Sequence, residues 1–104
     1  RAGYLIDPHT AVAFSALERY REETGDATPA IVVSTASPFK FCGSVLEALG
    51  ERETAQGLDA MDQLSAKTGI PVPAPLAGLR GKRVRFDQVV DKDRMAEAVL
   101  SLLG

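Results

Sequence analysis

Residues 30–41 have the sequence AIVVSTASPFKF, on which the predicted fold depends most. It starts with a short apolar run rich in β-branched side chains, which is typical of a strand buried in a parallel sheet. Hydroxyl side chains, a proline and a lysine follow. Ser37 or Thr35 is suited to cap a helix that has Pro38 in its first turn and runs to about Leu49. The stretch therefore predicts a buried strand that passes through a polar turn into a helix.

Helices are also predicted on both sides of this stretch. Asp7 is an expected N-cap, and Gly25 is the expected end of the helix that it opens. A further helix is expected over about residues 55–67, and a last one after Asp91 or Asp93. In each of these segments apolar side chains recur at helical spacing, so each helix is expected to bury one face.

Two more short strands complete the prediction, over residues 4–6 and 84–90. Residues 70–79 hold three prolines and are expected to be an extended connection. The element order is then β-α-β-α-α-β-α, an α/β chain that forms one unit over residues 1–104. We expect part of a three-layer α/β/α domain, with few short parallel strands and about four helices. Because so few strands cannot form a complete sheet, something upstream is expected to complete it.

Composition excludes several classes of protein. The 104 residues carry a net charge of -2 and no dominant basic patch, which argues against nucleic-acid binding. No apolar run approaches the ~20 residues needed to cross a bilayer, so no membrane contact is expected. The single cysteine, Cys42, cannot form an internal disulfide and is expected to pack as a small apolar side chain. It also fits a reducing, cytoplasmic location.

The turn at residues 34–41 allows two interpretations. In the first, its hydroxyls only cap the following helix. In the second, Thr35 and Ser37 face a polar ligand with Lys40 one turn away, because open α/β sheets bind ligands beyond strand ends near helix N-termini. His9 is the only histidine, and it is expected either to be exposed at the start of a helix or to act as an acid/base. The residues themselves leave these alternatives open. They include no metal-ligand, Ser-His-Asp or Gly-rich phosphate motif.

Two blocks in combination resemble the C-terminal region of threonine synthases: GYLIDPHTAVA (3–13) and VVSTASPFKF (32–41). The similarity continues through TGIPVPAPLAGL (68–79) to the last predicted helix. The resemblance implies a pyridoxal 5'-phosphate (PLP) enzyme of fold type II, with the tryptophan-synthase-β-like fold. It implies a carbon–oxygen lyase that forms threonine and phosphate from O-phosphohomoserine and water.

The resemblance also implies roles for individual residues. Thr35, with Ser34 beside it, matches the position whose hydroxyl bonds the pyridine nitrogen of the cofactor. A neutral hydroxyl does not hold that nitrogen protonated as an aspartate would, which suits elimination and replacement chemistry. This sequence departs from the family pattern at Ser37 and Phe39, where histidine and alanine are expected. The pocket residues implied by the resemblance are Asp7, His9, Thr10, Ser37 and Lys40.

The Schiff-base lysine, the asparagine at the cofactor's phenolic oxygen and the phosphate loop lie upstream in this family. We therefore expect a piece of a longer enzyme that neither binds PLP covalently nor turns over alone. Its expected partners are the rest of its own polypeptide and, through uncovered edges and apolar faces, a second copy. Two alternatives stay open: another PLP-dependent phospho-lyase or dehydratase, and a free-standing α/β binding or regulatory module.

Overall fold

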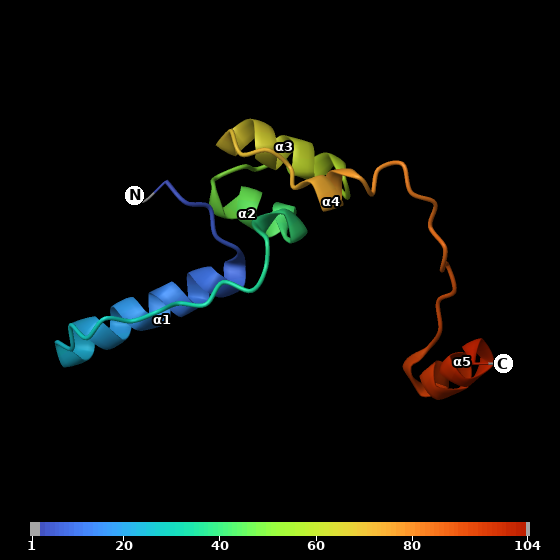
Figure 1. The fold of residues 1–104 in the computed structure, drawn as a ribbon, viewed down its shortest axis with the longest axis horizontal. Coiled ribbons are helices and arrows are strands. Elements are labelled where there is room, and N and C mark those ends of the chain that lie inside the picture. The colour runs from blue at the N-terminus through green and yellow to red at the C-terminus, as the bar shows by residue number, and fades with distance from the viewer. Residues whose placement is uncertain (1–2, 104) are drawn as a thin grey trace.

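The computed structural model describes residues 3–103, and the predicted unit extends beyond this range only by residues 1, 2 and 104. In the described range all regular elements are helical (Figure 1). They are α1 (Pro8–Thr24), the 3₁₀ turn η1 (Pro38–Lys40), α2 (Cys42–Ala48), α3 (Asp59–Thr68), the single turn α4 (Ala74–Ala77), the 3₁₀ turn η2 (Lys92–Arg94) and α5 (Met95–Leu102).

The helix boundaries follow the predicted capping residues. The Asp7 side chain accepts hydrogen bonds from the backbone N–H groups of His9 and Thr10, so α1 starts directly after it. Gly25 ends α1 and Gly69 ends α3, each with a φ of 70°, in the left-handed region that glycine enters without steric cost. The predicted cap at Asp7 and the predicted helix end at Gly25 are therefore confirmed.

The predicted α/β fold is wrong, because residues 3–103 contain no strand. The β-branched run that ends at Ser34 is solvent-exposed, with Ile31 93% exposed. Residues 29–36 make no backbone–backbone hydrogen bond with any part of residues 3–103. Residues 4–6 and 84–90 likewise form no strand, and the connection over 70–79 contains the turn α4. A strand exists only when a neighbouring strand pairs with its N–H and C=O groups, and these apolar segments have no such neighbour.

A small core holds the middle of the chain together. It lies mainly where α2 packs against α3, and η1 contributes to it (Figure 1). Its buried side chains are Phe39, Cys42, Val45, Leu46, Ala60, Met61 and Leu64. Arg80 fastens the end of this region to α3, with hydrogen bonds to Asp59 at 2.8 Å and to Asp62 at 2.6 Å. These contacts make residues 37–80 the packed part of the molecule.

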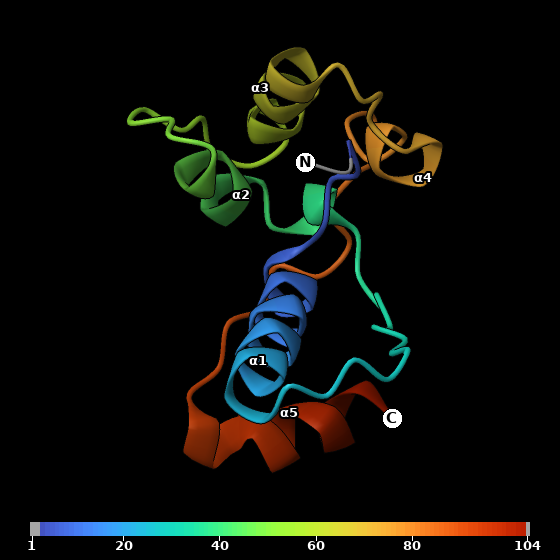
Figure 2. The same cartoon turned by 90° about the vertical axis from the view of Figure 1, so that its left-hand side faces the viewer.

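The remaining helices extend away from this core. Helix α1 projects from it, and α5 lies at the end of a long non-helical segment, apart from α1–α4 (Figures 1 and 2). The radius of gyration is 18.9 Å, whereas a compact chain of this length has about 13 Å. The accessible surface is 8707 Å², compared with about 5,700 Å² for a compact protein of this mass. Much apolar surface is therefore left uncovered.

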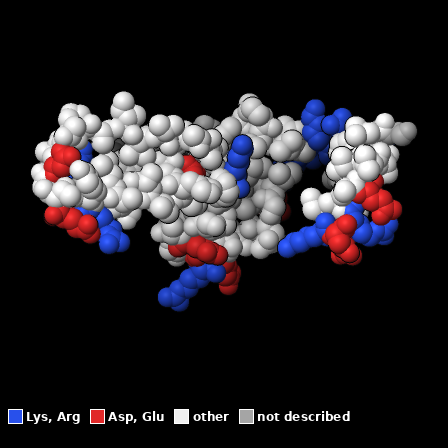
Figure 3. Space-filling model, turned by 90° about the horizontal axis from the view of Figure 1, so that it is seen from below, with Lys and Arg blue, Asp and Glu red and all other residues white. Residues whose placement is uncertain are grey.

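Charged side chains lie in small groups of mixed sign on the face shown in Figure 3. Several belong to short-range ion pairs, such as Arg19 with Glu23 and Arg94 with Glu97. Within residues 3–103, no helix is both long and apolar enough to cross a membrane.

Candidate functional site

The two sequence blocks meet where α1 begins. Asp7 is 1% exposed, and its Oδ1 accepts the backbone N–H of His9 at 3.0 Å and that of Thr10 at 3.4 Å. Its Oδ2 accepts the hydroxyl of Thr10 and, at 3.5 Å, the hydroxyl of Ser34. The two hydroxyl oxygens, Thr10 Oγ1 and Ser34 Oγ, lie 3.0 Å apart. One buried carboxylate thus joins residues that are 24 to 27 positions apart in the sequence.

This arrangement keeps the Asp7 carboxylate ionised. The hydrogen bond from the Thr10 hydroxyl, assisted by the bonds from His9, lowers the pKa of Asp7 from 3.8 to about 2, against the opposing effect of burial. An ionised carboxylate only accepts hydrogen bonds, so every group around Asp7 must turn a proton toward it.

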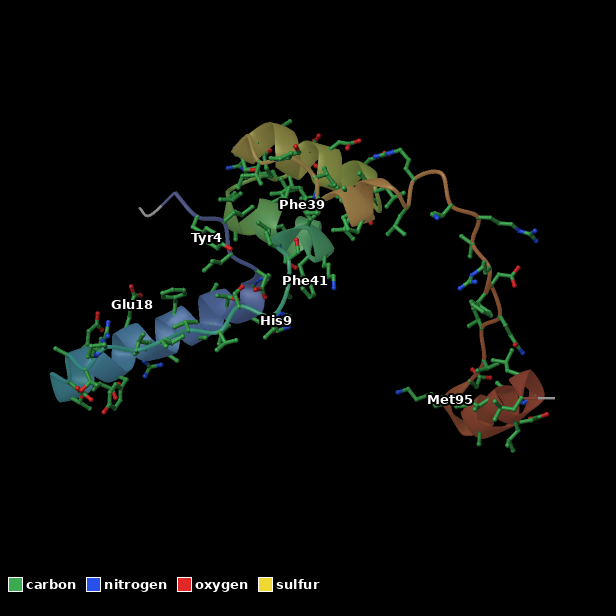
Figure 4. All side chains as sticks on the ribbon, viewed as in Figure 1. Tyr4, His9, Glu18, Phe39, Phe41 and Met95 are labelled. Carbon is green, nitrogen blue, oxygen red and sulfur yellow. The ribbon has the colours of Figure 1, made fainter. Side chains whose placement is uncertain are left out.

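His9 lies at the edge of the same cluster. Its Nδ1 is 3.1 Å from Asp7 Oδ1, while its side chain is 72% exposed. Its ring also meets the ring of Phe41 edge-on, with the centroids 5.0 Å apart (Figure 4). Asp7 and Phe41 together orient the imidazole at the junction of α1 with the 34–41 turn.

The three hydroxyls of that turn have different surroundings. Ser34 bonds to the Asp7 cluster, and Ser37 accepts the backbone N–H of Phe39 at 3.3 Å as the N-cap of η1. Thr35 lies between them and is exposed, and none of the hydrogen bonds found in residues 3–103 uses its side chain. The predicted cap at Ser37 is confirmed, and Thr35 is left available for contacts outside this chain.

Lys40 is not part of this cluster. It is exposed and lines a hollow of about 540 Å³ between α2 and the segment that precedes α3. Phe39, the unexpected residue before it, is buried in the core. Cys42 is also buried, as predicted, and burial raises the pKa of its thiol. In residues 3–103 no three His, Cys, Asp or Glu side chains come close enough together to hold a metal ion.

The residues of this cluster were all predicted as site residues from the sequence, but the central position of Asp7 among them was not predicted. Asp7 was recognised as a helix cap, and its bond to Ser34 was missed. No local pattern reports a side-chain contact between residues 27 positions apart, and only the presence of both blocks in one resemblance hinted that they meet.

Comparison with known proteins shows which family this chain resembles. A family model described as "Threonine synthase, C-terminal" matches residues 10–99. The chain belongs to this family. It is 45% identical to a threonine synthase of Corynebacterium glutamicum over 51 residues, which is 49% of this chain and 10% of the relative. It is 36% identical to a threonine synthase of Methylobacillus glycogenes over 67 residues, which is 61% of this chain and 14% of the relative.

A mouse protein named "Threonine synthase-like 1" matches a larger share of the chain. It is 33% identical over 73 residues, which is 69% of this chain and 9% of that protein. This member of the threonine synthase family therefore spans only about a tenth of the length of the relatives that it matches. The comparison with solved structures found no match.

Proposed function

We propose that this chain is part of a threonine synthase, a PLP-dependent lyase that converts O-phospho-L-homoserine and water into L-threonine and phosphate. The observation that carries the proposal is the threonine synthase family match over residues 10–99. The names of the bacterial relatives support it.

The residues of this chain fit one end of the cofactor. A pyridine nitrogen needs a polar partner, and Thr35 has an exposed hydroxyl that is not used within residues 3–103. PLP, when bound, supplies an electron sink for elimination and replacement at the substrate, and a neutral hydroxyl keeps that sink moderate. No residue here is recognisable as the covalent lysine or the phosphate loop. We therefore propose that Thr35 completes the cofactor site of the full-length protein and that this chain alone is inactive.

The rest of the full-length polypeptide is the proposed partner of the uncovered surface. Several large apolar side chains remain exposed on α5 and on the segment before it, among them Val84, Phe86, Val89, Leu100 and Leu102. Phe86, Val90, Met95, Val99 and Leu102 line a hollow of about 260 Å³ between that segment and α5. Contiguous apolar surface of this kind is unusual on a protein that acts alone.

Product analysis of the full-length protein tests the reaction. Incubation with O-phosphohomoserine should release equal amounts of threonine and phosphate. Thr35→Ala should lower kcat/KM about tenfold, because one neutral hydrogen bond contributes about 1.5 kcal/mol at most. Thr35→Ser, which keeps the hydroxyl, should retain most activity. Thr28→Ala is the matched control, because Thr28 lies in the same segment and its hydroxyl bonds to Asp26, at 2.6 Å, away from the cluster. An unchanged kcat/KM in Thr35→Ala would refute the assigned role.

A related PLP-dependent phospho-lyase or dehydratase is the second candidate. The relative that matches the larger share of the chain is named as threonine-synthase-like, and Ser37 and Phe39 depart from the expected pattern. The same product assay separates the two: phosphate released without threonine would favour the alternative. The third interpretation, a free-standing α/β module, required a sheet that residues 3–103 do not contain.

A further inference from the structure

Asp7 is placed to act on the candidate site without touching a ligand. It is almost fully buried, and both carboxylate oxygens already have partners from its own chain. Its one distant partner is Ser34, the residue directly before Thr35. This bond to Ser34 therefore links Asp7 directly to the residue beside Thr35.

The first effect is on the protons of the turn. A hydroxyl group carries a single proton. The Thr10 hydroxyl donates its proton to Asp7 Oδ2, and the Ser34 hydroxyl has two acceptors inside the cluster, Asp7 Oδ2 at 3.5 Å and Thr10 Oγ1 at 3.0 Å. Since the ionised carboxylate cannot donate, neither hydroxyl can turn its proton outward without losing its bond inside the cluster. Ser34 can offer only lone pairs to a group outside the cluster, whereas Thr35 keeps its proton available.

The second effect is on the position of Thr35. Within the described part of the chain, residues 29–36 have no backbone–backbone hydrogen bonds, so no sheet of residues 3–103 holds this segment in place. The Ser34 side chain anchors it on one side of Thr35, and the cap at Ser37 anchors it on the other. Because consecutive residues are only 3.8 Å apart, an anchor at Ser34 closely restricts where Thr35 can lie.

We propose that Asp7 is a positioning residue that makes Thr35, and not Ser34, the hydrogen-bond donor to the heteroaromatic ring nitrogen of the cofactor. This inference rests on the proposed function. It states that a buried carboxylate at the start of α1 determines which of two adjacent hydroxyls donates the hydrogen bond.

Two substitutions separate positioning from helix capping. Asparagine caps a helix as well as aspartate does, so Asp7→Asn keeps the start of α1. Its amide nitrogen is a donor and cannot accept the hydroxyl proton that Oδ2 now accepts. Asp7→Ser is the second variant, because serine also caps well and is too short to reach Ser34. The matched control is Asp59→Asn in the first turn of α3, which is exposed and paired with Arg80.

The experiment titrates the full-length variants with PLP and records the dissociation constant and the absorption spectrum of the bound cofactor. We expect Ser34→Ala to change the dissociation constant less than twofold and Thr35→Ala to raise it about tenfold. Asp7→Asn and Asp7→Ser should raise it about threefold and shift the spectrum in the direction of Thr35→Ala. In a Thr35→Ala background they should add nothing further, because the group that they position is gone. Asp59→Asn should have no effect.

Three outcomes would overturn the inference. The first is that Ser34→Ala weakens PLP binding as much as Thr35→Ala does. The second is that Asp7→Asn raises the dissociation constant for PLP by the same factor with and without the Thr35 hydroxyl. The third is that the wild-type protein does not bind PLP. The last outcome would also refute the proposed function. If PLP binds with the expected coupling but no threonine forms, the reaction assignment fails while the role of Asp7 stands.

Discussion

Replacing Leu46 by alanine should strongly destabilise the packed region. Leu46 is 0% exposed and lies in a core of only seven side chains. The substitution deletes three carbons, or about 2.4 kcal/mol at 0.8 kcal/mol for each buried methylene. The cavity left behind raises the total to about 3 kcal/mol, within the range of such substitutions. That loss lowers the folding equilibrium constant more than a hundredfold.

Leu100 in α5 provides a matched control for this substitution. It is 67% exposed, so Leu100→Ala in the same chain should change the free energy of unfolding by less than about 0.5 kcal/mol. In the full-length protein the proposed cover over α5 should raise that cost to about 2 kcal/mol or more. The comparison of one substitution in two contexts thus tests whether the rest of the polypeptide buries α5.

Urea unfolding followed by far-UV circular dichroism measures these changes, because the chain is helical and has no tryptophan for fluorescence. If the chain alone is less stable than the expected loss, Leu46→Ala will already be unfolded in water. The milder Leu46→Met, expected to cost less than about 1.5 kcal/mol, then supplies the measurable midpoint. Equal losses for Leu46→Ala and Leu100→Ala in the isolated chain would refute the location of the core.

Three other predictions concern pH, glycine geometry and association. The low pKa of Asp7 stabilises the start of α1 fully above pH 4, and this contribution should be lost as the pH falls through about 2. In Asp7→Asn the free energy of unfolding should depend less on pH in the acid range. An unchanged dependence of this free energy on pH would contradict the prediction. Gly25→Ala should destabilise the chain by about 1 kcal/mol because Gly25 has a positive φ. Gly43→Ala, at an open position inside α2, should stabilise the chain slightly. A higher melting temperature for Gly25→Ala than for Gly43→Ala would contradict both assignments. The isolated chain should self-associate through the apolar surface of residues 84–103, and a strictly monomeric sedimentation profile at high concentration would exclude this.

Much of the helical structure was predictable from local chemistry. Asp7, Gly25 and Gly69 set the ends of helices because capping and positive φ depend only on neighbouring atoms. Helical spacing also located α5, although the apolar face predicted to be inward is exposed. The strands failed for the opposite reason. Their β-branched composition is local, but the hydrogen bonds that define a strand come from another segment.

Packing within the predicted helices was also beyond local reasoning. The helix expected from Pro38 to about Leu49 is interrupted at Phe41, between η1 and α2. Leu46 is fully buried in α2, whereas Leu49, which directly follows this helix, is 41% exposed. A spacing rule assumes an unbroken helix and cannot anticipate where the helix is interrupted or ends.

The site divides in the same way. The residues of the turn AIVVSTASPFKF and of the Asp-Pro-His-Thr block determined the family and which side chains to suspect, since residue identities are all that a family pattern compares. The contact of Asp7 with Ser34, which leaves Thr35 available, is visible only in the folded chain. The direction of a hydroxyl proton depends on which distant acceptor lies within reach, and the folded chain alone brings that acceptor there.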